Sequence, residues 1–171
     1  HFVDDQNQLL MSVHALLVET PTKRLIVDTC VGNDKPRPLP QWNNLQGAFL
    51  RDLEALHCPR DKIDFVICTH LHVDHIGWNT MLVEGVWKPT FPNARYLIGR
   101  DEYAFWSSQT GASPMTTPWG FEDSVAPIFE EGLADLVDTD HRLSDEVSLE
   151  STPGHTPGHV SVRIRSQGQE A

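Results

Sequence analysis

Apolar residues recur along the chain in short runs that are typical of strands alternating with helices. Residues 9–18 carry apolar side chains on both faces of an extended segment, which predicts a largely buried strand. A turn at Thr20-Pro21-Thr22 leads into a second apolar run at 24–29. The two runs therefore predict a hairpin near the N-terminus.

Helical spacing first occurs after a proline-rich loop at residues 34–40. The apolar residues that recur three or four positions apart there are Leu45, Phe49, Leu53 and Leu56. They predict a helix with Asn43 or Asn44 as its N-cap. Short strands are predicted at 63–69 and 96–98.

The second half of the chain continues the alternation. A helix is predicted to open at Asp101-Glu102, where the helix dipole favours acids, and a loop is predicted at 110–120. The next predicted helix carries Ile128, Phe129 and Leu133, with Pro127 in its first turn. Two last strands are predicted around 147–152 and 160–165. The order indicates a mixed α/β fold in a single domain over residues 1–171.

The composition fits a folded protein with a buried core. Of the 171 residues, 39% are hydrophobic and 22% are charged. A formal net charge of −11 disfavours nucleic acid as a partner. No apolar run approaches the roughly 18 residues that a membrane span needs, so no membrane partner is expected. The odd number of cysteines, without CxxC spacing, favours reduced thiols and a cytoplasmic location: Cys30, Cys58 and Cys68.

The side chains best suited to chemistry gather directly after the predicted strand 63–69. His70, His72, Asp74 and His75 lie within six residues, and all four can bind a metal ion such as zinc. His70 and His72 share a face of an extended segment, and Asp74 and His75 can reach the same space once the chain turns into a helix. A single histidine more often has no ligand role, but this group beside a buried strand favours a metal site.

A second cluster of histidines lies in the turn between the last two predicted strands. Its sequence is Thr152-Pro153-Gly154-His155-Thr156-Pro157-Gly158-His159. Glycine and proline make such a connection tight and stiff, so it can hold a side chain in one position. Alone it would be interpreted as a surface loop, but beside the first cluster it is the expected source of a further ligand.

Together these motifs resemble the first three motifs of the metallo-β-lactamase-fold hydrolases. The resemblance runs from about Leu10 to the last strand. The residues that carry it are the strand-end acid Asp28, the cluster His70-x-His72-x-Asp74-His75 and the turn from Gly154 to His159. It implies an α/β fold of the αβ/βα sandwich type, with a dinuclear metal site at one edge of the two sheets.

The resemblance also implies a role for each motif residue and two divalent metal ions, zinc being the simplest choice. The implied ligands of the first ion are His70, His72 and His155. The implied ligands of the second ion are Asp74 and His75. Asp28 corresponds to an acid that orients the ligands from behind, and His159 to a histidine that supports the site.

Differences between branches of this superfamily narrow the expected chemistry. Flavin-linked di-iron members carry Glu at the position of His72, and true β-lactamases generally lack a histidine at the position of His75. Nucleases of this fold are disfavoured by the acidic net charge and the absence of a basic stripe. The segment 72–79, together with the proline-rich loop 34–40, is most similar to the lactonase and organophosphate-hydrolase branch.

This branch implies a hydrolase that acts on a small molecule. A metal-bound hydroxide would attack an ester-type carbonyl, with a lactone as the favoured substrate, and Asp74 would guide the proton. Two alternatives stay open: a phosphotriester or thioester hydrolase with the same centre, and a metal-binding fragment without turnover. Among the aromatic residues near the motifs, Trp78 is the best candidate for the substrate pocket, with ordinary packing as the alternative.

The family pattern continues with a bridging Asp and a further His on later strands. No Asp or His follows His159 in this sequence. We therefore expect the second metal site to be incomplete in these residues and the C-terminal part of the sandwich to be missing from them. The start at His1, without an initiator Met, predicts an incomplete N-terminus as well. No pattern indicates an oligomeric state.

Overall fold

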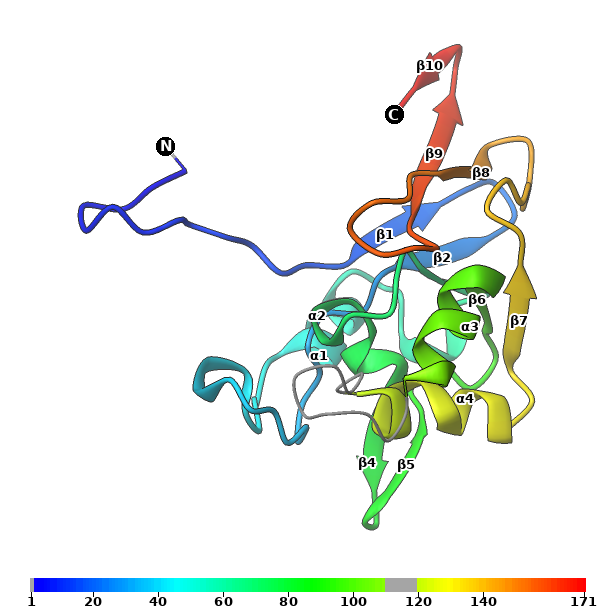
Figure 1. The fold of residues 1–171 in the computed structure, drawn as a ribbon. Coiled ribbons are helices and arrows are strands. Elements are labelled where there is room, and N and C mark those ends of the chain that lie inside the picture. Colours follow the sequence, from blue (N-terminus) through cyan, green and yellow to red (C-terminus); the bar gives the residue numbers. More distant parts are fainter. Residues whose placement is uncertain (1, 110–119) are drawn as a thin grey trace.

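A five-stranded sheet forms the centre of the protein, whose computed structural model describes residues 2–109 and 120–171 (Figure 1). Its strands lie in the order β1, β2, β3, β6 and β7. β1 pairs with β2 in the antiparallel sense, and the remaining neighbours are parallel. The bounds of these strands are β1 (Leu16–Glu19), β2 (Arg24–Val27), β3 (Phe65–Cys68), β6 (Arg95–Gly99) and β7 (Ala134–Val137).

Helices connect the parallel strands, as crossover connections between parallel strands require. They are α1 (Phe49–Ala55), α2 (Val73–Ile76), α3 (Arg100–Ser108) and α4 (Ala126–Glu130), which directly follows a π-helical turn at Phe121–Val125. Short 3₁₀ turns lie at Pro40–Trp42, Arg60–Lys62 and Gly77–Asn79. A second sheet contains β8 (Val147–Ser151), β9 (Val160–Ser166) and β10 (Gln169–Glu170), and β4 (Thr80–Val83) forms a separate hairpin with β5 (Val86–Pro89).

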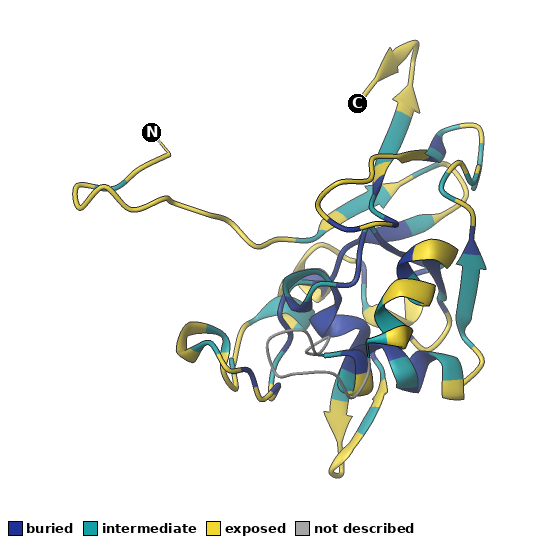
Figure 2. Ribbon diagram, in the orientation of Figure 1, coloured by how far each residue is buried: buried dark blue, intermediate teal, exposed yellow. Residues whose placement is uncertain are grey.

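The central sheet is covered on both faces, because successive side chains of a strand point to opposite sides. Val66 and Cys68 of β3 pack in a core with helix residues such as Leu53 of α1. Ile67, between them, packs instead with Leu149 of β8 and Val160 of β9. The layers therefore follow the order helices, central sheet, second sheet, and the inner strands β2, β3 and β6 are mostly buried (Figure 2).

The topology brings three loops to one edge of the central sheet. β2 and β3 are parallel neighbours, so Asp28 and Thr69, which follow them, emerge side by side. The backbone N–H of Val160, at the start of β9, donates to the carbonyl of Thr69 at 3.0 Å. The turn between β8 and β9 is therefore held at the same edge.

The predicted N-terminal strand is much shorter than expected, and most of it is exposed. The hairpin is confirmed, but pairing starts only at Leu16, which lies opposite Val27. Leu9, Leu10 and Met11 are 73%, 58% and 82% exposed, in the extended N-terminal segment of Figure 2. The prediction of a buried strand over 9–18 was wrong. The apolar pattern shows only that these side chains favour burial, and it does not show whether a partner strand is present. β2 ends at Val27, opposite Leu16, so residues before Leu16 have no strand to pair with there.

The first helix also differs from its prediction. α1 begins at Phe49, so Leu45 and Leu56 lie outside it, and its N-cap position is Ala48, which makes no side-chain cap. Neither predicted cap acts there. The Asn43 side-chain oxygen accepts the backbone N–H of Arg37 at 3.0 Å, and Asn44 has a left-handed φ of +50°. Both asparagines therefore stabilise the loop before α1. Asparagine is common in turns as well as at helix N-caps, so the residue type alone does not distinguish the two roles.

The later elements agree better with the pattern. α3 has Asp101 and Glu102 in its first turn, and Pro127 lies in the first turn of α4, as predicted. α4 ends at Glu130, so Leu133 falls outside it. The sequence reasoning missed β7 and the β4–β5 hairpin, and most of the predicted loop at 110–120 lies outside the described residues.

All three cysteines are free thiols, and Cys58 and Cys68 are buried. Burial raises the pKa of Cys68 to about 12, which makes it an unreactive core residue. Among the described residues, no helix combines the length and the hydropathy needed to cross a membrane.

A buried ion cluster anchors the proline-rich loop. The Arg37 guanidinium donates to both carboxylate oxygens of Asp123, at 2.6 and 3.0 Å. Lys35 is fully buried: its ammonium donates to the Thr80 hydroxyl at 2.5 Å and lies 3.6 Å from the centre of the Trp87 ring. Burial lowers the pKa of Lys35 to about 7. The cluster ties the loop after β2 to the π-helical turn and to the β4–β5 hairpin.

Candidate metal centre

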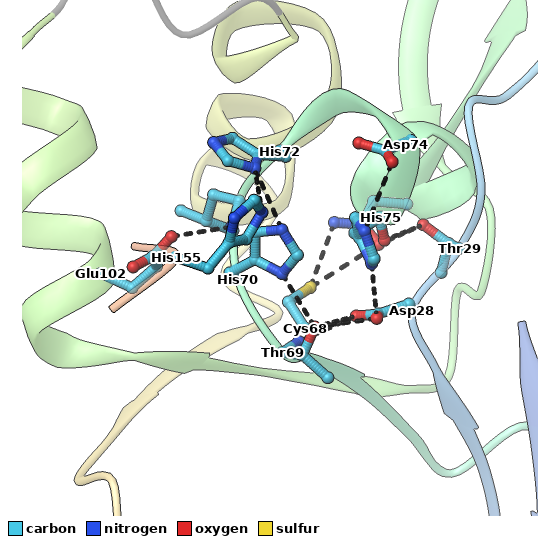
Figure 3. Close-up of polar contacts among 12 residues, drawn as sticks. Asp28, Thr29, Cys68, Thr69, His70, His72, Asp74, His75, Glu102 and His155 are labelled. Atoms are coloured by element: carbon cyan, nitrogen blue, oxygen red, sulfur yellow. Dashed lines mark hydrogen bonds and ion pairs between the residues drawn. The ribbon is translucent and has the colours of Figure 1, made fainter. Parts of the chain in front are cut away.

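Two segments supply the histidine cluster (Figure 3). His70 follows the buried end of β3, and His72 stands at the N-terminus of α2, which contains Asp74 and His75. His155 comes from the turn between β8 and β9, 83 residues after His72. The structure thus brings the two predicted motifs together.

The three residues predicted for the first metal converge on one point. His70 Nε2 lies 3.1 Å from His72 Nδ1, which lies 3.0 Å from His155 Nε2. One ring nitrogen from each of the three lies within 4.8 Å of the others. Two nitrogens bound to one tetrahedral zinc are about 3.3 Å apart, given bond lengths of about 2.0–2.1 Å. The donor set and its spacing fit a single divalent ion.

A hydrogen-bonded chain sets the tautomer of His70. The Thr69 hydroxyl donates its one hydrogen to the Asp28 carboxylate, at 2.8 Å from Oδ2. Its oxygen, 3.0 Å from His70 Nδ1, is therefore left to accept the N–H of the ring. A neutral His70 then presents the lone pair of Nε2 toward His72 and His155, as a metal ligand must.

Asp28 also holds the helix that carries His75. The His75 Nδ1 lies 2.7 Å from Asp28 Oδ2, and its Nε2 lies 3.4 Å from Asp74 Oδ2. The other Asp28 oxygen accepts the backbone N–H of Thr69 at 2.8 Å. A left-handed φ of +57° at Asp28 turns the chain sharply after β2. This acid therefore connects the end of β3 to the helix that carries His75, and its role in orienting the ligands stays a prediction.

The histidines differ in protonation when no metal is present. Burial, together with the neighbouring histidines, lowers the pKa of His70 to about 3. Burial alone would also lower the pKa of His75, but its hydrogen bonds to Asp28 and Asp74 raise it to about 9. His75 in turn keeps the pKa of Asp74 below its usual value, although burial opposes this.

These opposite shifts predict that the two histidines together stabilise the metal-free chain most near pH 6.5. Lys35, whose pKa is lowered to about 7, acts in the opposite sense to His75 above pH 7, so the contribution of His75 is measured as a difference between the wild type and a variant. His75 stabilises the fold as a cation, so its contribution is complete below its ordinary pKa of 6.5 and is lost as the pH rises toward 9. His70 stabilises the fold as a neutral ring, so its contribution is complete above 6.5 and is lost as the pH falls toward 3. Urea denaturation across this range measures the free energy of unfolding.

The matched variant for this measurement is His75→Gln, which cannot be protonated. We expect the difference in the free energy of unfolding between the wild type and this variant to shrink as the pH rises from 6.5 to 9, and the loss of stability on the acid side to stay in place. A difference that stays constant over this range would show that His75 does not stabilise the fold as a cation.

A groove of about 500 Å³ opens beside Asp28, Asp74 and His75. Its other walls are the N-terminal segment around Met11 and the first residues of β9. His159 also lines the groove, and its Nδ1 lies 2.9 Å from the Thr152 hydroxyl. Its ring centre is 5.0 Å from that of His70, next to the three-histidine group but outside it.

Trp78 lies in the core rather than in the wall of this groove. It is buried, and its ring stacks on that of Phe49 at 5.4 Å. The preceding Gly77 packs against the loop after β2, where an added Cβ would lie 1.8 Å from the carbonyl oxygen of Val31. Trp78 is not among the residues that line the groove, and its part in a substrate pocket stays a prediction.

Sequence reasoning missed three residues that contact the cluster. Thr69 was assigned only to its strand, and Glu102 only to the first turn of a helix. Trp106, one of several aromatic residues near the motifs, makes an edge contact with His72, with ring centres 5.3 Å apart. Glu102 and Trp106 are four residues apart, so they share a face of α3. An acid and a large aromatic residue on the same helix face were the sequence signal that could have pointed to these two residues.

Comparison with known proteins identifies the family. A family model for the Metallo-beta-lactamase superfamily matches residues 10–170, and the chain belongs to this superfamily. The family predicted from the motifs is therefore confirmed. Members of this superfamily typically bind divalent metals, in agreement with the three-histidine group.

Relatives and solved structures agree with this assignment. An N-acyl homoserine lactonase of Bacillus thuringiensis is 23% identical over 172 residues, which cover 93% of this chain and 60% of that lactonase. A probable metal-dependent hydrolase from Staphylococcus aureus has a similar structure, with a TM-score of 0.81 at 23% identity over 99% of this chain and 59% of its own. AidC, a dizinc quorum-quenching lactonase in complex with a product, has a TM-score of 0.64 at 24% identity, over 91% of this chain and 53% of its own.

The structural likenesses confirm the predicted fold class, a metallo-β-lactamase-like α/β sandwich. The chain spans 53% to 60% of the length of these three proteins.

Proposed function

We propose that the whole protein is a metal-dependent hydrolase and that His70, His72 and His155 hold one divalent ion, most simply zinc. The observation that supports this most directly is the convergence of three ring nitrogens within 4.8 Å. Three polar rings in contact lose water on several sides, and a shared divalent ion would offset this cost for all three at once. The hydrogen bond from His70 Nδ1 to Thr69 leaves the nitrogen that faces the group free.

A second ion would be held by Asp74 and His75, which lie on the side of the cluster nearest the groove. The His70 and His75 ring centres are 4.1 Å apart, so the two ions would be neighbours. Asp28 would keep His75 oriented, as its 2.7 Å contact already does. The dizinc composition of the structural neighbour AidC supports a pair of zinc ions. These two side chains are fewer than the three protein ligands of a typical catalytic zinc, so the first ion should bind more tightly.

The chain's own residues define what the site can do. A divalent ion supplies a water of lowered pKa and polarises a carbonyl oxygen. Asp74 borders the groove, and its lowered pKa keeps it ionised at neutral pH. Its carboxylate would accept a proton from a water at the site and direct it toward the departing oxygen. Asp28 and Thr69 keep the histidines in place during this transfer.

A lactone is the substrate class we propose. The support is the lactonase relative, which aligns with 93% of this chain, and a groove whose volume of about 500 Å³ suits a small molecule. We also propose a cytoplasmic location, on the evidence of three cysteines that are all free thiols.

The test is turnover of a substrate panel by the zinc-loaded protein. The panel contains N-acyl homoserine lactones, simple lactones, a phosphotriester and a thioester, each assayed before and after chelation and again after zinc is restored. We expect lactone hydrolysis that chelation abolishes and zinc restores. Faster turnover of the phosphotriester or thioester would replace the lactone assignment, and tight zinc binding without turnover of any substrate would overturn the enzymatic proposal.

A further inference from the structure

Glu102 is a buried carboxylate that connects the two segments of the histidine cluster. It lies in the first turn of α3 and is only 1% exposed. Within the described part of the chain it has no ion-pair partner, and its charge is stabilised by three N–H donors. Leu71 N and Trp106 Nε1 donate to Oε1 at 3.0 and 2.7 Å, and Gly158 N donates to Oε2 at 3.0 Å (Figure 3 shows Glu102 beside the cluster).

The two backbone donors belong to the two segments that carry the histidines. Leu71 stands between His70 and His72, and Gly158 follows His155 by three residues. The two oxygens of one carboxylate thus join backbone segments that are 87 residues apart in sequence, since 158 − 71 = 87. Hydrogen bonds to a buried, charged acceptor are stronger than those between neutral groups. This side chain therefore acts together with the bond from the Val160 N–H to the Thr69 carbonyl in holding the two segments at a set distance.

The turn lies directly against the backbone of α3. A Cβ added to Gly158 would lie 2.2 Å from the backbone nitrogen of Glu102. Only glycine allows this approach without displacing the turn. Close backbone packing and the hydrogen bond from Gly158 act on the same contact, so the position of His155 follows that of α3.

Trp106 adds a third connection. Its indole N–H holds the Glu102 carboxylate, and its ring meets the edge of His72 at 5.3 Å between centres. The same helix face therefore orients both the acid and one of the rings. His70 is fixed from both sides, because Asp28 accepts the N–H of Thr69 and Glu102 accepts that of Leu71.

We propose that Glu102 is a positioning residue for the first metal: its carboxylate sets the spacing between the His70–His72 segment and His155. The inference rests on the proposed metal-binding role of these three histidines. Asp28 contacts the loop after β3 and α2, whereas Glu102 connects that loop to the His155 turn. Its removal should therefore alter the geometry of the ion.

The experiment is titration of the chain with Co²⁺, whose visible spectrum reports the coordination geometry, and competition with a chelator to measure affinity. Glu102→Gln keeps the shape of the side chain but replaces one acceptor oxygen with an NH₂ group, which only donates. The amide can therefore no longer accept the N–H of Leu71 on one atom and the N–H of Gly158 on the other. We expect its Co²⁺ affinity to fall about 10- to 100-fold, with a changed spectrum. The matched control is Asp101→Asn, which removes the neighbouring exposed acid of the same helix and should match the wild type.

The outcomes separate this inference from the proposed function. Absence of Co²⁺ binding by the wild type would overturn the proposed metal site itself. Wild-type affinity and spectrum in a folded Glu102→Gln, even with a lower unfolding temperature, would reduce Glu102 to a merely structural residue. If Glu102→Gln does not fold, Trp106→Phe removes only one of the three donors and should still change the spectrum. An unchanged spectrum and affinity in that variant would overturn the positioning role.

Discussion

Replacing His72 with alanine is expected to abolish metal binding at the three-histidine group and hydrolysis with it. His72 Nδ1 lies between the other two ligand atoms, at 3.1 Å from His70 and 3.0 Å from His155. Without it, two histidines remain, below the three protein ligands that a catalytic zinc keeps. Elemental analysis of the purified variant should show the loss of one equivalent, and turnover should fall to that of the metal-free protein.

The control for this prediction is His141→Ala, which removes a histidine of the β7–β8 connection, outside the cluster. It should keep its metal and its activity. Normal metal content together with normal turnover in His72→Ala would show that the ligands are assigned wrongly.

Replacing Asp123 with alanine is expected to lower the free energy of unfolding by about 3–5 kcal/mol, the usual cost of leaving a buried charge without its partner. The Arg37 side chain is 2% exposed, and Asp123 is the carboxylate that pairs with it. Lys35, fully buried as well, would lose its ion pair at 3.4 Å in the same variant. Urea denaturation at neutral pH measures the change.

The comparison for Asp123→Ala is Asp135→Ala, which breaks the ion pair between Asp135 and Arg95. Both of these side chains are about 40% exposed, and exposed pairs contribute about 0–1 kcal/mol. If the two variants lose similar stability, burial of the Lys35–Arg37–Asp123 cluster does not increase its contribution to the free energy of unfolding.

Local patterns in the sequence predicted the elements that depend on few distant contacts. The buried strand before His70 was predicted because an apolar run of this kind is stable only between two layers. The turn at 20–22 predicted the β1–β2 hairpin, since antiparallel neighbours need only a short connection. Pro127 was placed correctly because its ring is tolerated only in the first turn of a helix.

The errors arose where a partner had to be known in advance. Residues 9–15 have a strand pattern, but no neighbouring strand reaches them among the described residues, apart from one bridge between Val3 and Leu9. Asn43 has the chemistry of a helix cap, yet the Arg37 N–H, brought near by the buried ion cluster, uses its oxygen. Glu102 looked like an ordinary acid of a first turn until the fold placed Leu71 and Gly158 beside it.

The sequence by itself determined which metal-capable residues are candidates for the site. Four metal-capable groups within six residues and a stiff histidine turn are properties of the chain alone, and they were enough to identify the family that the comparisons confirm. Only the tertiary structure decided how these groups meet. Parallel pairing of β2 with β3 brings Asp28 beside Thr69, and the contact of Gly158 with α3 brings His155 to His72. Such contacts join residues dozens of positions apart, and their free energy exists only after the layers have packed, so no local pattern could contain them.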